Sequence, residues 1–180
     1  MLDDLERWAA EARARDAAEG RVRERHLRQA AGHDAGFVGV LLDLAEQAGS
    51  VIVTTVRGTT FAGRVVAVGD DFAGLRTSAG RVVLIAFPGI ADVSPAPGHR
   101  GAPAAGFRST QSLDVTLGDM LASAAAARCR MSIRCGERVV NGELRSVGRD
   151  VITLLAAGPP PRPSYVVLTS VSDASFLDSG

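Results

Sequence analysis

Two aspartates occupy matching places in two similar stretches of the chain. Asp71 ends the segment Val-Gly-Asp-Asp, and Asp150 ends Val-Gly-Arg-Asp, 79 residues later. A carboxylate retained in both stretches invites a catalytic interpretation, since Asp can act as a general acid or base. An Asp two residues after Gly is also typical of hairpin turns, in which Gly can take positive φ and Asp can bond its own backbone. We therefore interpret Asp71 and Asp150, together with Gly69 and Gly148, as turn residues.

The cysteines and histidines do not form a recognisable ligand set. Cys129 and Cys135 are six residues apart, whereas a zinc site needs about four ligands at closer paired spacing. His26, His33 and His99 are scattered through the N-terminal part of the chain and the linker. No grouping of Ser, His and Asp has a supporting motif either. We predict no metal site, no cofactor and no catalytic centre, and hence a protein that is not an enzyme.

The balance of charge constrains the class of partner. The 20 acidic residues offset 20 basic residues, all of them Arg, so no global field attracts a polyanion. A neutral total still permits local basic patches that bind RNA or DNA. The candidate nucleic-acid contacts are arginines of the two strand-rich regions: Arg57, Arg64, Arg76, Arg81, Arg128, Arg130 and Arg134.

Residues 1–33 have the pattern of a charged helix rich in Ala, Arg and Glu. Its apolar face is thin, so the helix is either solvated or available to a partner. Leu5 and Trp8 are the candidate partner-binding residues, because aromatic side chains often anchor interfaces. The start of the chain has no apolar segment like that of a signal peptide, and the apolar runs are too short to cross a bilayer. We expect a soluble cytoplasmic protein that does not bind membranes.

The remaining chain alternates between helical and strand-like patterns. Helices are predicted over Phe37–Gln47 and over Leu113–Ala127, the second capped by Ser112 or Asp114. Val, Thr and Ile broken by Gly predict short strands with tight turns, and the pattern returns from Arg130 onward. The first five predicted strands are Val51–Val56, Thr60–Val68, Phe72–Thr77, Val82–Phe87 and Ile90–Val93. The predicted domains are an N-terminal helix (1–33), a first domain (34–93), a Pro- and Gly-rich linker (94–111) and a second domain (112–180).

The two strand-rich regions repeat one pattern. Gly63 falls on Gly142 at an offset of 79, whereas the later strands match at 81, because two extra residues fall in a Pro-rich loop. A Gly inside a strand marks a bend or a close backbone approach. The three-residue spacing from Val65 to Val68 requires a bulge to keep both side chains on one face. We predict that each region is a strongly bent five-stranded antiparallel sheet, curled into a small barrel behind its leading helix.

A helix followed by five bent strands, with apolar-x-Gly-x-apolar in the second strand, resembles the Sm-like fold over Phe37–Val93 and Leu113–Ala174. The layout is similar to an uncharacterised bacterial family with a long N-terminal helix and two tandem Sm-like barrels, whose members are sometimes labelled Fis-family transcriptional regulators. The resemblance implies a mainly β protein with α, built from two tandem Sm-like or SH3-like barrels. It also implies homo-oligomers in which the fourth strand of one barrel pairs with the fifth strand of the next.

The polar residues of the Sm RNA pocket are missing from both regions. The family's Asp falls on Gly69 and Gly148, and its Asn falls on Ala73 and Ile152. The usual RNA site is therefore not expected. Arg145 and Arg149, followed by Asp-Ala-Ser-Phe-Leu-Asp, are similar to the two motifs of PilZ domains, but Asp178 replaces the last Gly and the arginines would lie at a hairpin turn.

The sequence leads to two functional hypotheses of different classes. The first is a non-catalytic assembly or adaptor protein that self-associates, because exposed strand edges must be paired or protected. Its partners would be further copies of itself and an unknown protein. The alternative is an RNA- or DNA-binding regulatory protein that uses surface arginines in place of the usual Sm RNA pocket.

Overall fold

The computed structural model describes residues 36–47, 49–97 and 111–177. The predicted N-terminal helix over residues 1–33, with Leu5 and Trp8, lies outside the described residues. The chain divides into the units Met1–Gly39 and Val40–Gly180, and every strand belongs to the second unit.

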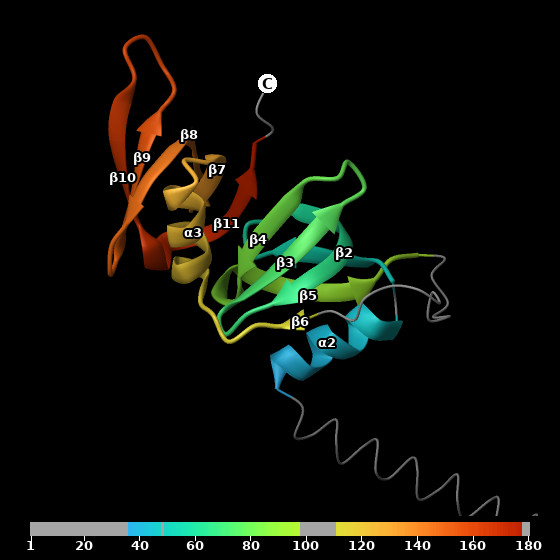
Figure 1. Cartoon of the computed structure of the whole chain (residues 1–180). Helices are drawn as coiled ribbons and strands as arrows, with labels where there is room; N and C mark the ends of the chain where they lie inside the picture. The colour runs from blue at the N-terminus through green and yellow to red at the C-terminus, as the bar shows by residue number, and fades with distance from the viewer. Residues whose placement is uncertain (1–35, 48, 98–110, 178–180) are drawn as a thin grey trace, which may run out of the picture. The chain divides into compact units, whose positions relative to one another are not determined.

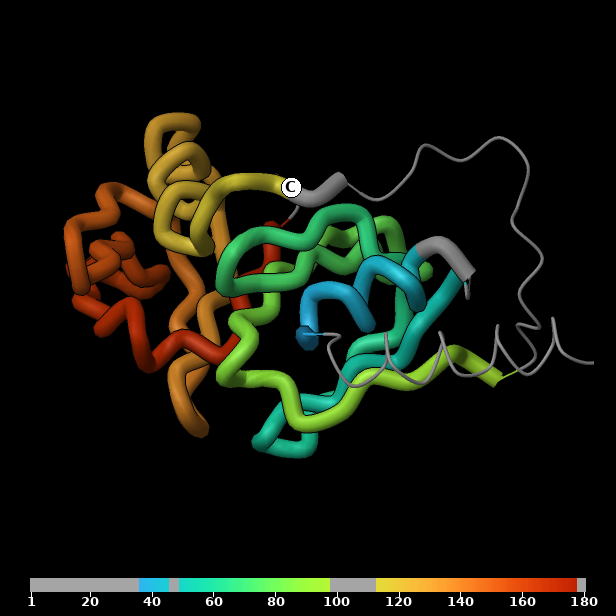
Figure 2. The backbone as a smooth tube through the Cα atoms, turned by 90° about the horizontal axis from the view of Figure 1, so that it is seen from below, coloured from blue at the N-terminus to red at the C-terminus, as the bar shows by residue number. Residues whose placement is uncertain are grey.

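Five consecutive strands form the N-terminal strand set, in the order β5-β1-β2-β3-β4 with every neighbour antiparallel. A short 3₁₀ turn, η1 (Phe87–Gly89), separates β4 from β5. The chain runs through this set before it enters the next one (Figure 2). The strands are β1 (Val51–Thr55), β2 (Thr60–Val68), β3 (Phe72–Thr77), β4 (Val82–Ala86) and β5 (Ile90–Pro95). All five predicted strands are present, with ends within two residues of those expected.

The C-terminal strand set repeats this arrangement, in the order β11-β7-β8-β9-β10. Its turn η2 (Leu168–Ser170) separates β10 from β11, as η1 separates β4 from β5. The strands are β7 (Arg130–Cys135), β8 (Arg138–Val147), β9 (Val151–Ala156), β10 (Arg162–Val167) and β11 (Val171–Phe176). The internal repeat seen in the sequence is therefore a repeat of strand order.

The prediction of two closed barrels is wrong. Strand β4 pairs with β11 and not with β5, which joins the two sets into one open antiparallel sheet of ten strands (Figure 1). An eleventh, two-residue strand, β6 (Gln111–Ser112), lies off this path and runs parallel to β2. A barrel would need the outer edge of β4 for its own set, but β11 already occupies that edge. The ends of the strand order are consequently β10 and β5.

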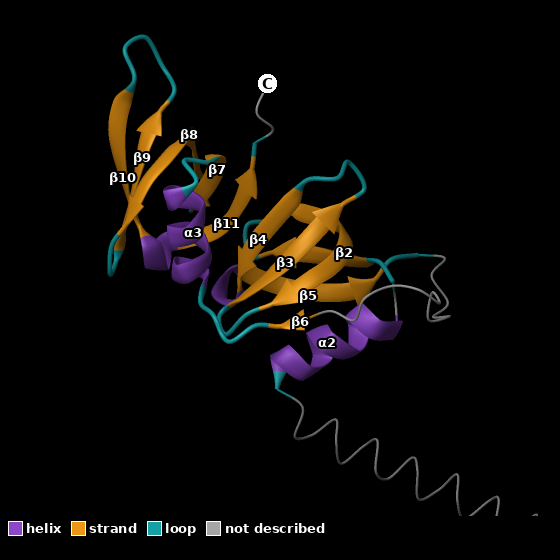
Figure 3. Ribbon diagram, viewed as in Figure 1, coloured by secondary structure: helices purple, strands orange, loops and turns teal. Residues whose placement is uncertain are grey.

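The described residues contain two short helices, α2 (Phe37–Gln47) and α3 (Leu117–Ala126), shown in purple in Figure 3. Helix α2 has the predicted bounds, whereas α3 begins four residues later than expected. Thr116 is the cap of α3, because its hydroxyl accepts the Asp119 backbone N–H while the Asp119 carboxylate accepts the Thr116 N–H. The Thr116 hydroxyl also lies 2.6 Å from Asp119 Oδ2 as a donor, and this bond, together with the bond from the Thr116 backbone N–H, lowers the pKa of Asp119. Neither Ser112 nor Asp114 has this role, and Ser112 belongs to β6.

Gly63 and Gly142 mark close contacts between strands, as the sequence predicts. A Cβ atom on Gly63 would overlap the main chain of Arg76, and one on Gly142 would lie 2.5 Å from the Leu155 carbonyl oxygen. The pairing register shifts just after each glycine, between Val65 and Ala67 in one set and at the matching place in the other. The predicted bulge is confirmed in both sets, and each glycine lets the bent strand approach its neighbour.

Replacing Gly142 with Ala is expected to destabilise the protein, because the new methyl group meets rigid backbone. We expect Gly142→Ala to lower the free energy of unfolding by about 2 kcal/mol. Gly158→Ala is the matched control, since a Cβ there would lie 3.7 Å from its nearest neighbour, in ordinary contact. Urea denaturation of both variants measures the difference, and equal stability would contradict the close contact at Gly142.

Candidate functional site

The joint between the two strand sets is a continuous piece of both sheet and core. Asp173, Ala174 and Ser175 of β11 lie opposite Ile85, Leu84 and Val83 of β4, respectively. Leu84 is 2% exposed and Ala86 is 8% exposed. Both belong to the apolar cluster that α3 forms with the C-terminal set. The outer edge of β4 and its side chains are therefore closed to solvent by the second set.

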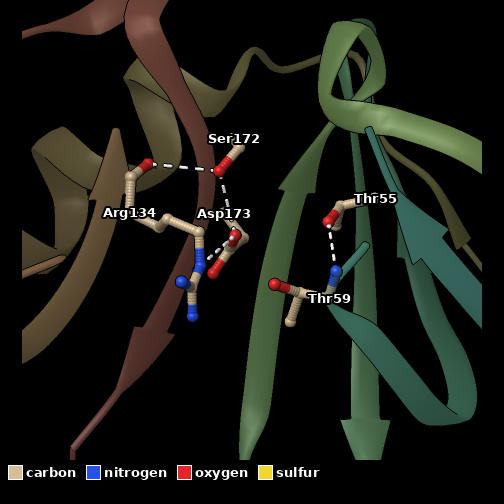
Figure 4. Close-up of polar contacts among 5 residues, drawn as sticks. All are labelled: Thr55, Thr59, Arg134, Ser172 and Asp173. Carbon is tan, nitrogen blue, oxygen red and sulfur yellow. Dashed lines mark hydrogen bonds and ion pairs between the residues drawn. The ribbon is translucent and has the colours of Figure 1, made fainter. Parts of the chain in front are cut away.

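A polar cluster accompanies this joint (Figure 4). Asp173 is only 4% exposed, and Nε of Arg134 lies 3.2 Å from its Oδ2 in an ion pair that lacks hydrogen-bond geometry. The Ser172 hydroxyl donates to Asp173 Oδ2 at 3.0 Å and lies 3.4 Å from the Arg134 carbonyl oxygen. Turn η1 also approaches β11 closely, because a Cβ on Gly89 would lie 2.8 Å from the Ser172 carbonyl oxygen. Strand pairing, a charged pair and a turn thus meet at one place.

Burial raises the pKa of Asp173, since desolvation penalises the charged carboxylate. The hydrogen bond from Ser172 and the charge of Arg134 act in the opposite direction without cancelling this effect. Near this cluster, buried Thr55 accepts the backbone N–H of Thr59 at 3.1 Å and ends β1 (Figure 4). Each of these groups has a partner within the chain, although Arg134 Nε contributes an ion pair without a hydrogen bond, and we assign the cluster a structural role at the joint.

The two strands at the ends of the sheet present the same kind of edge without a partner among the described residues. Val167 lies opposite Val151 in β10 as Ala86 lies opposite Phe72 in β4, so Tyr165 takes the place of Leu84. Tyr165 is 70% exposed and Val167 is 56% exposed. In β5, Ala91 and Asp92 are exposed, whereas Ser172 and Asp173 at the matching places in β11 are buried. These two edges, β10 and β5, are the candidate interaction site.

The predicted turn residues lie at the β2–β3 and β8–β9 hairpins. Gly69 donates to the Phe72 carbonyl at 2.9 Å, and Gly148 donates to the Val151 carbonyl at 2.7 Å. The expected positive φ is wrong for both, because among the described residues the glycines with positive φ are Gly49, Gly58, Gly80 and Gly136. The expected bond of Asp71 to its own turn is also replaced by a longer-range one. Its carboxylate accepts the backbone N–H of Leu117 at 2.6 Å, at the start of α3.

The arginines predicted to contact nucleic acid are divided between the two strand sets. Arg64 donates to the Gly49 carbonyl at 3.0 Å, Arg128 pairs with Glu143 at 3.4 Å, and Arg134 pairs with Asp173. The remaining predicted contacts are exposed: Arg57, Arg76, Arg81 and Arg130. Of the two PilZ-like arginines, Arg145 pairs with Glu143 at 3.2 Å and Arg149 lies in the β8–β9 hairpin.

The resemblance implies that a fourth strand pairs with the fifth strand of the next barrel, in another copy, whereas β4 pairs with β11 within the chain. The sequence carries a local signal for this joint. Strand β4 reads Val-Val-Leu-Ile-Ala without a polar residue, whereas β10 reads Arg-Pro-Ser-Tyr-Val-Val. A continuous apolar run is typical of a strand that is buried on both faces. This difference between two otherwise equivalent strands marks β4 as interior and β10 as an edge.

Comparisons with known proteins leave the resemblance to tandem Sm-like proteins as a prediction. No family model matches the chain, and no curated protein matches it. Within residues 36–47, 49–97 and 111–177, no three His, Cys, Asp or Glu side chains are grouped so that they could hold a metal ion. Cys129 and Cys135 are free thiols that pack against the apolar cluster. None of the described helices is long and apolar enough to span a membrane.

The raised pKa of Asp173 predicts a pH-dependent contribution to stability. A carboxyl whose pKa is higher in the folded state favours folding most when it is protonated, and this contribution is lost as the pH rises through the folded pKa. We expect the difference in unfolding free energy between the wild type and Asp173→Asn to favour the wild type most at pH 3 and to shrink as the pH rises from there to pH 7. Urea denaturation of both proteins across this range measures it, and a pH-independent difference would contradict the prediction.

Proposed function

We propose that the chain is a non-catalytic assembly or adaptor protein whose copies join head to tail, with β10 of one copy pairing to β5 of the next. One observation supports this proposal above the others. Strand β10 exposes Tyr165 and Val167 at the places where β4 buries Leu84 and Ala86 against the neighbouring set. The β4–β11 joint within the chain therefore shows the kind of contact that the outer edges, β10 and β5, could make with another copy.

The proposed contact has a defined register. Within the chain, Val83, Leu84 and Ile85 pair with Ser175, Ala174 and Asp173. At the equivalent places, Ser164, Tyr165 and Val166 of one copy would pair with Ser94, Val93 and Asp92 of the next. Pro163 precedes this stretch and so removes no donor from it, although a proline on an edge strand otherwise blocks pairing.

Physical chemistry favours occupation of these edges. An edge strand presents unpaired N–H and C=O groups, and large apolar side chains along it add burial to the main-chain pairing. Because one edge of each copy would meet the opposite edge of another, the contact is heterologous. Repetition of such a contact either closes a ring or extends a filament.

Self-association should depend on concentration and on the exposed edge of β10. We expect light scattering to show a mass that increases with protein concentration, after nuclease treatment and in high salt. Val167→Lys should weaken the association at least tenfold, since it places a charge in an apolar contact. Val139→Lys is the matched control, because Val139 is also an exposed valine but lies on β8, away from the sheet ends.

Two outcomes would contradict the proposal. A monomeric mass throughout the accessible concentration range would show that the edges are not used. Ultraviolet-absorbing material that leaves on nuclease or salt treatment would favour RNA or DNA binding through the surface arginines, because such binding weakens steeply with salt.

A further inference from the structure

The turns η1 and η2 have the same backbone arrangement. The residue that follows each turn donates its N–H to the carbonyl of the first turn residue. That first residue, Phe87 or Leu168, itself donates at 2.8 Å to the carbonyl of an aspartate of its own set, Asp71 or Asp150. The residue before each turn is extended, with ψ of 139° in one case and 123° in the other. The third residues of the two turns therefore occupy equivalent places.

The third residue of η1 is Gly89, which is buried against β11. A Cβ atom there would lie 2.8 Å from the carbonyl oxygen of Ser172 and 3.0 Å from its Cα, so a side chain would require the backbone to move. Gly89 is not among the described glycines with positive φ, and its conformation is therefore open to other residues. The missing side chain serves only the close approach, which lets η1 rest on β11 where β4 pairs with it.

The third residue of η2 is Ser170, which is exposed. Its hydroxyl donates to the Val167 carbonyl at 2.7 Å, which fixes the side chain at the end of β10. In the register proposed for the contact between copies, η2 would approach Ala91 of the next copy as η1 approaches Ser172. The Cβ of Ser170 would then fall in the space that Gly89 leaves empty at the joint within the chain.

We propose that Ser170 limits the contact between copies, because its Cβ meets the backbone of Ala91 in the next copy and holds η2 away from β5. This inference rests on the proposed function, since it assigns the residue that sets the strength of the β10–β5 contact. Strand pairing at Ser164, Tyr165 and Val166 is retained, but the turn does not close over β5 as η1 closes over β11. The contact between copies is consequently looser than the joint within the chain.

Removal of the Ser170 side chain tests the inference. We expect Ser170→Gly to lower the dissociation constant of self-association about tenfold, measured by light scattering over a dilution series, because a steric clash in a packed contact is relieved. Ser170→Ala should associate like the wild type, since it keeps the Cβ atom and loses only the hydroxyl. Ser78→Gly is the matched control, because Ser78 is an exposed serine in the turn between β3 and β4, away from the sheet ends.

A double variant tests whether the stronger association uses the edge of β10. Ser170→Gly combined with Val167→Lys should lose the gain, because the lysine places a charge in the apolar part of the same contact. A gain that survives Val167→Lys would overturn the inference, since the copies would then associate through another surface.

The reciprocal change tests the close approach within the chain. Gly89→Ala places a Cβ atom against the Ser172 backbone, and we expect it to lower the urea concentration at the midpoint of unfolding. Gly158→Ala is the control, because the added atom there makes only an ordinary contact. An unchanged midpoint for Gly89→Ala would overturn the inference, since the turn would then accept a side chain at this place.

The outcomes separate this inference from the proposed function. If the wild type self-associates and Ser170→Gly associates equally well, or Ser170→Ala gains as much as Ser170→Gly, the steric role of Ser170 is wrong while the edge contact stands. If the wild type is monomeric and Ser170→Gly associates through β10, the role of Ser170 stands and the proposed function is wrong. If both proteins are monomeric at every concentration, both proposals are wrong.

Discussion

The structure depends on main-chain pairing between β4 and β11. Two sets of five strands with the same order would otherwise be separate sheets, each with an open edge beside its fourth strand and another beside its fifth. Pairing across three residues of each strand removes one open edge from each set. Because Leu84 and Ala86 enter the core of the other set, the same contact joins backbone and apolar core. Neither set can then present β4 or β11 to another partner.

Strand bounds, hairpins and bulges were predictable because they are local. Gly63 and Gly142 mark where two backbones approach, and the three-residue spacing after each glycine fixes a register shift that the structure contains. Whether each set closes into its own barrel could not be predicted in this way. Closure depends on which edge meets β4, and hydrogen bonding by an edge strand is equally satisfied by its own set or by another. The deciding information lies in side chains far apart in the sequence, such as Leu84 and Ala174.

Residues near the joint also show that no single offset in residue number aligns the two strand sets. Thr55 lies opposite Ile90, and Cys135 lies opposite Val171, so Cys135 takes the place of Thr55, at an offset of 80 and not of 79. The turn between the first two strands is thus one residue shorter in the C-terminal set. That shift places Arg134 opposite Asp173, whereas the equivalent Asp92 lies opposite Thr54. The ion pair between Arg134 and Asp173 therefore depends on the length of a turn, which differs by one residue between the sets. No local sequence pattern indicates this ion pair.

This difference between Asp173 and Asp92 affects the expected strength of two contacts, the β4–β11 joint and the proposed β10–β5 contact between copies. Once β4 covers Asp173, its charge can no longer be solvated by water, and Arg134 and Ser172 compensate for part of this cost. A slip of one residue in β11 against β7 would separate this carboxylate from Arg134, so the ion pair selects one register. Asp92 faces Thr54, which offers a hydroxyl but no charge, and covering it with β10 of another copy would desolvate a less well compensated carboxylate. The same strand geometry therefore favours a permanent joint inside the chain and would make the proposed contact between copies weaker and reversible.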